Sequence, residues 1–97
     1  MRRIAVIGPS GVGKTTTSAR LARSLDIPHI ELDAIHWGPN WTPAERDVFC
    51  ATVDRALSGD GWVVDGSYSS VRHIVWPRAD TVVWLDYGLP RVLWQLL

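Results

Sequence analysis

The chain has 97 residues, 46% of them hydrophobic, and its ten Lys and Arg residues balance ten Asp and Glu residues. This composition suits one globular domain with a modest core, and it excludes an overall positive field that would gather DNA or anionic membrane. The single cysteine, Cys50, excludes an intrachain disulfide and is typical of a reducing compartment. Because every apolar run is also too short to span a bilayer, we expect a cytoplasmic protein without a membrane partner.

Strand-like and helix-like segments alternate along the first half of the chain. Residues 4–7 (Ile-Ala-Val-Ile) form a short apolar run, typical of a strand that is covered on both faces. Residues 14–25 carry apolar side chains at helical spacing, and residues 29–33 form a second short strand. Residues 42–45 (Thr-Pro-Ala-Glu) combine an N-cap, a proline at the first helical position and a glutamate at the third, which predicts a helix to about Leu57.

The second half continues the alternation. Residues 62–65 and 81–86 are strand-like, and each run ends in an aspartate. We therefore expect an α/β fold in which parallel strands end at one common edge, where ligands bind. Residues 89–97 begin like a helix but carry no C-terminal capping signal, so we expect the N-terminal part of a longer domain.

Residues 8–15 match the phosphate-binding pattern G-x-x-x-x-G-K-[ST], between a predicted strand and a predicted helix. Glycines let the backbone N–H groups point at phosphate oxygens, and the positive end of the helix faces the same charge. An accidental glycine-rich turn is the alternative, and the flanking elements argue against it. We expect Lys14 to reach the β- and γ-phosphates and the Thr15 hydroxyl to bind Mg²⁺. The predicted ligand is a nucleoside triphosphate, most simply ATP with Mg²⁺, bound by Gly8, Pro9, Ser10, Gly11, Val12, Gly13, Lys14, Thr15 and Thr16.

Three aspartates, Asp33, Asp65 and Asp86, end predicted strands at the ligand edge. Asp65 precedes Gly66, so its carboxylate should emerge where the backbone turns sharply, and it is our first choice for the Mg²⁺ shell. Capping of the strand end is the alternative role for Asp65. Asp86 also ends an apolar run, so this pattern alone does not distinguish it from Asp65.

A candidate acceptor side follows the second strand. Asp33, His36 and Trp37 bring a carboxylate, an imidazole and an indole close to where a phosphoryl acceptor would lie. Asp33 is a candidate base for an acceptor hydroxyl, or it pairs with His36 and caps the turn. Arg72 either grips an acceptor phosphate or is a solvated arginine. His29 has no metal-ligand spacing and is assigned a structural role.

Six tryptophans invite a base-stacking interpretation. Trp62 and Trp84 lie in predicted core strands and Trp94 on an apolar helix face, so packing is the simpler expectation for these three. Trp37 and Trp41 are the better ligand candidates.

Together these motifs resemble the adenylate-kinase-related P-loop kinases, and most closely the group labelled DNA topology modulation proteins. The resemblance covers the whole chain and rests on residues 8–15, 32–37, 62–68 and 79–86. It implies a three-layer P-loop NTPase fold with a mostly parallel sheet in the order 2-3-1-4. It also implies that the strand with Asp65 and Gly66 lies beside the P-loop strand, which favours Asp65 over Asp86 for the metal. An acceptor site around Asp33 and Arg72 is the further implication.

The resembling kinases continue into an arginine-bearing lid and a final strand, which we expect to be missing from these 97 residues. Our first hypothesis is an ATP-dependent phosphotransferase acting on a small molecule or nucleotide, with Lys14, Asp33 and Asp65 as catalytic residues. The alternative is a non-catalytic ATP-binding regulatory module. The neutral charge balance argues against direct nucleic-acid binding in either case.

Overall fold

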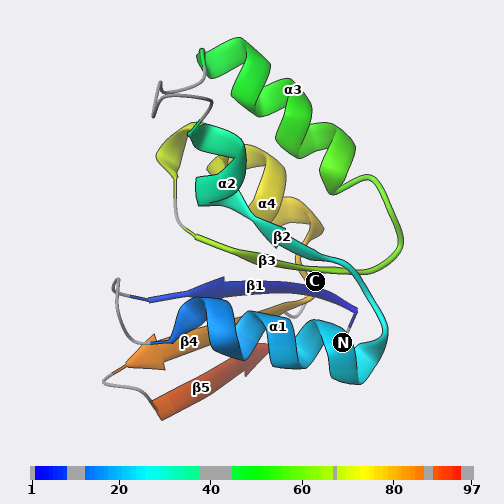
Figure 1. The fold of residues 1–97 in the computed structure, drawn as a ribbon, viewed down its shortest axis with the longest axis vertical. Helices are drawn as coiled ribbons and strands as arrows, with labels where there is room; N and C mark the ends of the chain where they lie inside the picture. Colours follow the sequence, from blue (N-terminus) through cyan, green and yellow to red (C-terminus); the bar gives the residue numbers. More distant parts are fainter. Residues whose placement is uncertain (1, 9–12, 38–44, 67, 87–88, 95–97) are drawn as a thin grey trace.

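One sheet organises the chain (Figure 1). The computed structural model describes residues 2–8, 13–37, 45–66, 68–86 and 89–94, with the backbone alone for residues 86 and 89–94. The strand order is β2-β3-β1-β4-β5. The strands are β1 (Arg3–Ile7), β2 (His29–Glu31), β3 (Trp62–Asp65), β4 (Thr81–Asp86) and β5 (Leu89–Trp94). The first four pair in parallel, which confirms the α/β fold and the predicted order 2-3-1-4.

Helices cover both faces of this sheet. They are α1 (Lys14–Leu25), α2 (Leu32–His36), α3 (Arg46–Ala56) and α4 (Arg72–Arg78), and a 3₁₀ turn, η2 (Ser69–Val71), leads into α4. Because successive side chains of a strand point to opposite faces, β1 serves two cores. Ile4 and Val6 pack with Ala22 of α1, whereas Ala5 packs with Phe49 of α3 and the other helices of that face. The three-layer arrangement is thus confirmed.

Helix α1 has the predicted limits because the backbone at both ends favours termination. Gly13 precedes it with φ 84° and Asp26 follows it with φ 56°, both left-handed conformations that helices do not continue through. The amide of Asp26 donates to the carbonyls of Ala22 and Arg23, which satisfies groups that the helix end would leave unpaired.

The helix predicted from Leu89 is wrong, because residues 89–94 form β5 instead. This strand pairs antiparallel with β4, and Val92 lies opposite Val83. Pairing satisfies the N–H and C=O groups that the free edge of β4 would expose. Proline is tolerated at Pro90 because β5 is an edge strand.

Two other boundaries differ from the predictions, and one segment forms elements that were not predicted. The second strand ends at Glu31, so Asp33 lies in α2 rather than at a strand end. Helix α3 begins at Arg46, because the backbone of Glu45 is extended, and residues 42–44 lie outside the described residues. Residues 69–78, for which no element was expected, form η2 and α4.

The tryptophan predictions are correct only in part. Trp62 is fully buried, and its indole Nε1–H donates to the carbonyl oxygen of Leu57 at 3.2 Å. Trp84 is 45% exposed, so the predicted core role is wrong. The core on the α3 and α4 side takes its buried strand residues from β1 and β3, which leaves this part of β4 uncovered. Trp41 and the side chain of Trp94 lie outside the described part of the chain.

Candidate functional site at the carboxyl edge of the sheet

The carboxyl ends of the parallel strands meet at one edge, and the predicted phosphate loop starts there (Figure 1). Gly8 follows β1 directly and has φ 149°. A Cβ at this position would lie 2.6 Å from the carbonyl oxygen of Leu85, so only glycine fits. Pro9, Ser10, Gly11 and Val12 lie outside the described residues.

The loop ends at Gly13, and α1 begins at Lys14, as the motif requires. The amide of Thr17 donates to the carbonyl oxygen of Gly13 at 2.9 Å, which closes the first turn. The amides of this turn have no acceptors within the helix, so they can bind an anion. Thr15 and Thr16 are exposed and Lys14 is half-buried at this end of α1.

Asp65 ends β3 opposite Val6 of β1 and is 6% exposed. Its Oδ2 lies 2.6 Å from Nε2 of His29. Gly66 follows with φ 111°, a conformation that favours glycine, so the sharp turn predicted after Asp65 is present. A buried carboxylate therefore lies at the end of the strand next to the phosphate loop.

Asp86 ends β4, which is the other neighbour of β1. Adjacency to the P-loop strand therefore does not by itself distinguish Asp65 from Asp86. Val63, two residues before Asp65, packs in the core cluster that contains Ala22 of α1. By strand alternation, Asp65 belongs to the face that carries the helix with Lys14 and Thr15, which favours Asp65 as the metal partner.

The acceptor-side carboxylate has a partner that the sequence did not indicate. The Tyr68 hydroxyl donates a hydrogen bond to Oδ1 of Asp33, a partner other than the His36 that the sequence suggested. Burial, followed by this hydrogen bond and the negative charge of Asp33, raises the pKa of Tyr68 to about 12. The contact joins α2 to the segment that follows β3.

His36 lies within an aromatic cluster formed with Trp37, Phe49 and Tyr68. Its ring centroid is 5.0 Å from Trp37, 5.1 Å from Phe49 and 4.7 Å from Tyr68. The Nδ1 atom of His36 is buried without a hydrogen-bond partner, whereas Trp37 is 41% exposed. The structure thus brings Asp33, His36 and Trp37 to one place, with Trp37 as the most accessible ring.

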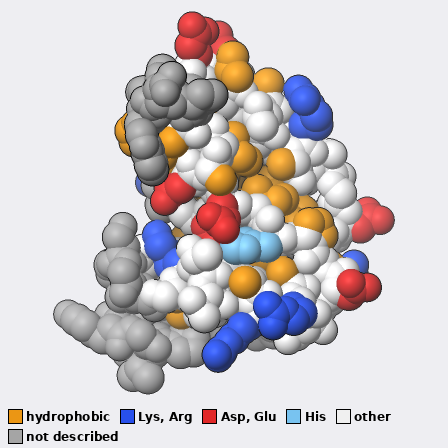
Figure 2. All heavy atoms as spheres, viewed as in Figure 1, with side chains coloured by type: hydrophobic (Ala, Val, Ile, Leu, Met, Phe, Trp, Pro, Cys, Tyr) orange, Lys and Arg blue, Asp and Glu red, His pale blue; other side chains and the backbone are white. Residues whose placement is uncertain are grey.

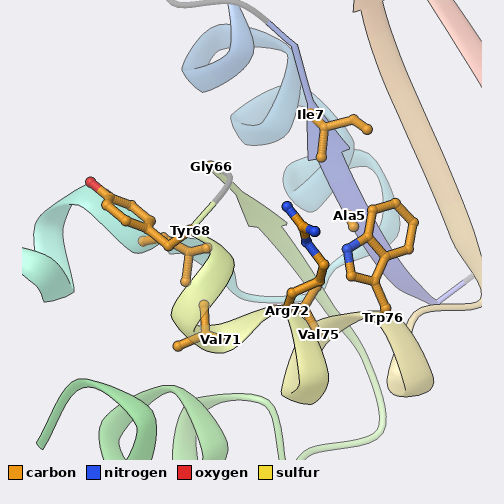
Figure 3. Close-up of a pocket in the computed structure, with 9 residues that line it drawn as sticks. Ala5, Ile7, Gly66, Tyr68, Val71, Arg72, Val75 and Trp76 are labelled. Atoms are coloured by element: carbon orange, nitrogen blue, oxygen red, sulfur yellow. The ribbon is translucent and has the colours of Figure 1, made fainter. Parts of the chain in front are cut away.

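Arg72 borders a pocket beside the carboxyl end of β1. Figure 3 shows its side chain extending from the start of α4 beside Trp76, whereas Tyr68 points away toward α2. The lining comprises Ala5, Ile7, Leu32, Gly66, Tyr68, Val71, Arg72, Val75 and Trp76. Sequence reasoning missed Trp76, although its spacing of four residues from Arg72 would place both side chains on one face of a helix.

Among the described residues there is neither a membrane-spanning helix nor a cluster of metal-ligating side chains. No helix there is long and apolar enough to cross a membrane. No group of three or more His, Cys, Asp or Glu side chains there is arranged to hold a metal ion. A Mg²⁺ that takes most of its ligands from nucleotide phosphates and water does not need such a group.

Comparison with known proteins relates this chain to kinases. No protein-family model matches the chain. Over 69 residues it is 35% identical to a cytidylate kinase of Maridesulfovibrio salexigens, a match that covers 69% of this chain and 31% of that protein. Over 28 residues it is 57% identical to an adenylate kinase of Streptomyces griseus, covering 29% of this chain and 78% of that sequence.

A solved structure supports the same relationship. A gluconokinase from Sinorhizobium meliloti superposes with a TM-score of 0.59 at 26% identity, covering 88% of this chain and 57% of that one. The chain therefore belongs to the P-loop kinases. It spans about a third of the cytidylate kinase and somewhat more than half of the gluconokinase.

Proposed function

We propose that the protein is an ATP-dependent phosphotransferase that acts on a small molecule or a nucleotide. The observation that carries the proposal is the arrangement at one sheet edge, where Gly8 leaves β1, Lys14 begins α1 and Asp65 ends the adjacent β3. Phosphoryl transfer depends mainly on positioning and charge neutralisation, and these residue types supply both. The kinase relatives support the same class of reaction.

The residues present fit a magnesium nucleotide. Residues 8–15 would hold the phosphates, with Lys14 as the cation and the first turn of α1 supplying amides. Thr15 and Asp65 would hold Mg²⁺, because this hard cation accepts a hydroxyl and a carboxylate while keeping phosphate and water ligands. When bound, the metal neutralises charge that develops on the phosphates.

On the acceptor side, Asp33 is the proposed base for an acceptor hydroxyl. The Tyr68 hydroxyl occupies one carboxylate oxygen and leaves the other for the acceptor. Arg72 and Trp76 supply a cation and an indole to the adjoining pocket, while Trp37 offers an exposed ring. His36 would act at this site through its packing against the rings of Trp37 and Tyr68.

Within the P-loop kinases, residues 32–37 and 62–68 resemble the group labelled DNA topology modulation proteins. That label is not a reason to propose DNA binding. Figure 2 shows acidic and basic side chains interspersed on the face displayed, without a basic stripe, and the chain has no net charge.

Replacing Asp33 separates a kinase from a regulatory ATP-binding module. ADP release would be measured with CMP, AMP and gluconate as acceptor probes, and ATP affinity would be measured separately. For Asp33→Asn we expect acceptor-stimulated turnover to fall by about 10²–10⁴-fold while ATP affinity hardly changes.

Asp60→Asn is the matched control, because Asp60 is exposed and lies just before β3, away from the strand ends that form the site. Undiminished turnover in Asp33→Asn would remove Asp33 from the mechanism. ATP binding without stimulation by any acceptor probe would favour the regulatory module.

A further inference from the structure

The contact between His29 and Asp65 joins two strands at the nucleotide edge. His29 begins β2, Asp65 ends β3, and the two residues are 36 positions apart in the sequence. Their side chains are 17% and 8% exposed. A carboxylate oxygen can only accept, so the distance of 2.6 Å between Nε2 and Oδ2 requires His29 to donate from Nε2.

Strand register explains how His29 reaches this carboxylate. His29 lies opposite Val63, and Glu31 lies opposite Asp65, so the imidazole crosses diagonally by two positions. Both residues belong to the sheet face against which α1 packs. Ser18, one turn beyond Thr15 in α1, is fully buried on that face, and its Oγ has no hydrogen-bond partner. Polar groups thus lie between the sheet and α1, the helix whose Thr15 hydroxyl is proposed to bind Mg²⁺.

The carboxylate of Asp65 is constrained from two sides. His29 holds Oδ2, and Gly66 sets the backbone direction directly after the residue. Groups that hydrogen-bond a ligating carboxylate fix its orientation, and their loss commonly weakens metal binding by about 10–100-fold. Fixing a carboxylate before the metal arrives also lowers the cost of ordering it.

We propose that His29 is a positioning residue that orients Asp65 so that Oδ1 is presented to the magnesium shell of the bound nucleotide. This inference rests on the proposed function, because it requires that Mg-ATP binds at this edge. It departs from the structural role that the sequence suggested for His29.

The test compares ATP affinity with and without Mg²⁺, the latter in EDTA, by titration calorimetry. Mn²⁺ binding to the ATP complex, followed by electron paramagnetic resonance, gives a second reading that does not depend on turnover. The variants are His29→Gln, whose amide nitrogen can occupy the position of Nε2, and His29→Asn, whose amide is too short to reach Oδ2. Asp65→Asn is the benchmark, and His73→Gln on the exposed face of α4 is the control. Thermal unfolding is measured for each.

We expect His29→Asn to lose about tenfold in Mg²⁺-dependent affinity, as Asp65→Asn does, while metal-free ATP affinity stays at the wild-type level. His29→Gln and His73→Gln should remain close to wild type. If His29→Asn keeps its Mg²⁺ dependence while Asp65→Asn loses it, the positioning role is overturned and the proposed function stands. If Asp65→Asn is also unaffected, the magnesium assignment fails together with the inference. A wild-type protein that does not bind Mg-ATP overturns the proposed function itself.

Discussion

At the scale of single residues, the hydrogen bond from Tyr68 to Asp33 gives the acceptor side a measurable signature. Burial and the carboxylate both favour the neutral phenol, so the pKa of Tyr68 is raised to about 12. A group whose pKa is raised on folding contributes stability below its unfolded pKa and loses it as the pH rises through the folded value. The contribution of Tyr68 is therefore complete below about pH 10 and is lost toward pH 12.

Ultraviolet absorbance is titrated against pH for the wild type and for Tyr68→Phe, and one titration curve is subtracted from the other. This difference should isolate one phenol with a midpoint near 12, about two units above an ordinary tyrosine. In Asp33→Asn the midpoint should fall but stay above the ordinary value, because burial is the largest cause of the shift. A midpoint near 10 in the wild type would contradict both the burial of Tyr68 and its contact with Asp33.

The residues of the site divide into those that sequence could indicate and those it could not. The phosphate motif is contiguous, so residues 8–15 could be recognised without a structure. The partners Tyr68 of Asp33 and His29 of Asp65 are 35 and 36 positions away and meet because β2 and β3 are neighbours in the sheet. No local pattern encodes such pairs.

At the scale of elements, the turn after β3 depends on one glycine. Gly66 has φ 111°, and an added Cβ would lie 3.0 Å from the Cβ of Leu32. Gly66→Ala should lower the free energy of unfolding by about 1–3 kcal/mol, because the left-handed backbone and the contact with α2 are both unfavourable. It should also weaken Mg²⁺-dependent ATP binding, because Asp65 would move with the turn.

Urea unfolding of Gly66→Ala beside Gly59→Ala checks this prediction. A Cβ at Gly59 meets nothing within 4 Å and its φ is not in the left-handed region, so that substitution should stay within about 0.5 kcal/mol of wild type. Equal stabilities of the two variants would contradict the strained turn.

Elements were predicted well where one pattern dominated and poorly where two competed. Strands β1, β3 and β4 and helix α1 follow from unbroken apolar runs and helical spacing. Val71, Ile74 and Val75 also have helical spacing, but Pro77 lies inside α4 and obscures it. The residues of β5 suit a helix or a strand, and the open edge of β4 decides between them.

At the scale of the whole molecule, stability depends on the core between the sheet and helices α3 and α4. Trp62 is the largest fully buried side chain among the described residues, and its indole also donates to the carbonyl oxygen of Leu57. Trp62→Ala should cost about 3–5 kcal/mol, a large part of the stability of a small domain. Trp84→Ala is the matched control, and its exposed position should make the cost much smaller.

Chemical unfolding followed by circular dichroism compares the two variants. Similar losses for Trp62→Ala and Trp84→Ala would mean that Trp84 is buried in solution, contrary to the structure. This comparison therefore tests Trp84, for which the sequence predicted a core role that the structure contradicts.

The central claim for the whole molecule is that the edge formed by Gly8, Lys14 and Asp65 binds Mg-ATP. Isothermal titration calorimetry of the wild type and of Lys14→Ala tests it most directly. We predict 1:1 binding by the wild type and at least about tenfold weaker binding by Lys14→Ala, because a charge-assisted contact to phosphate is lost. Equal affinity in both proteins, or no binding by a wild type that unfolds cooperatively, would contradict the account.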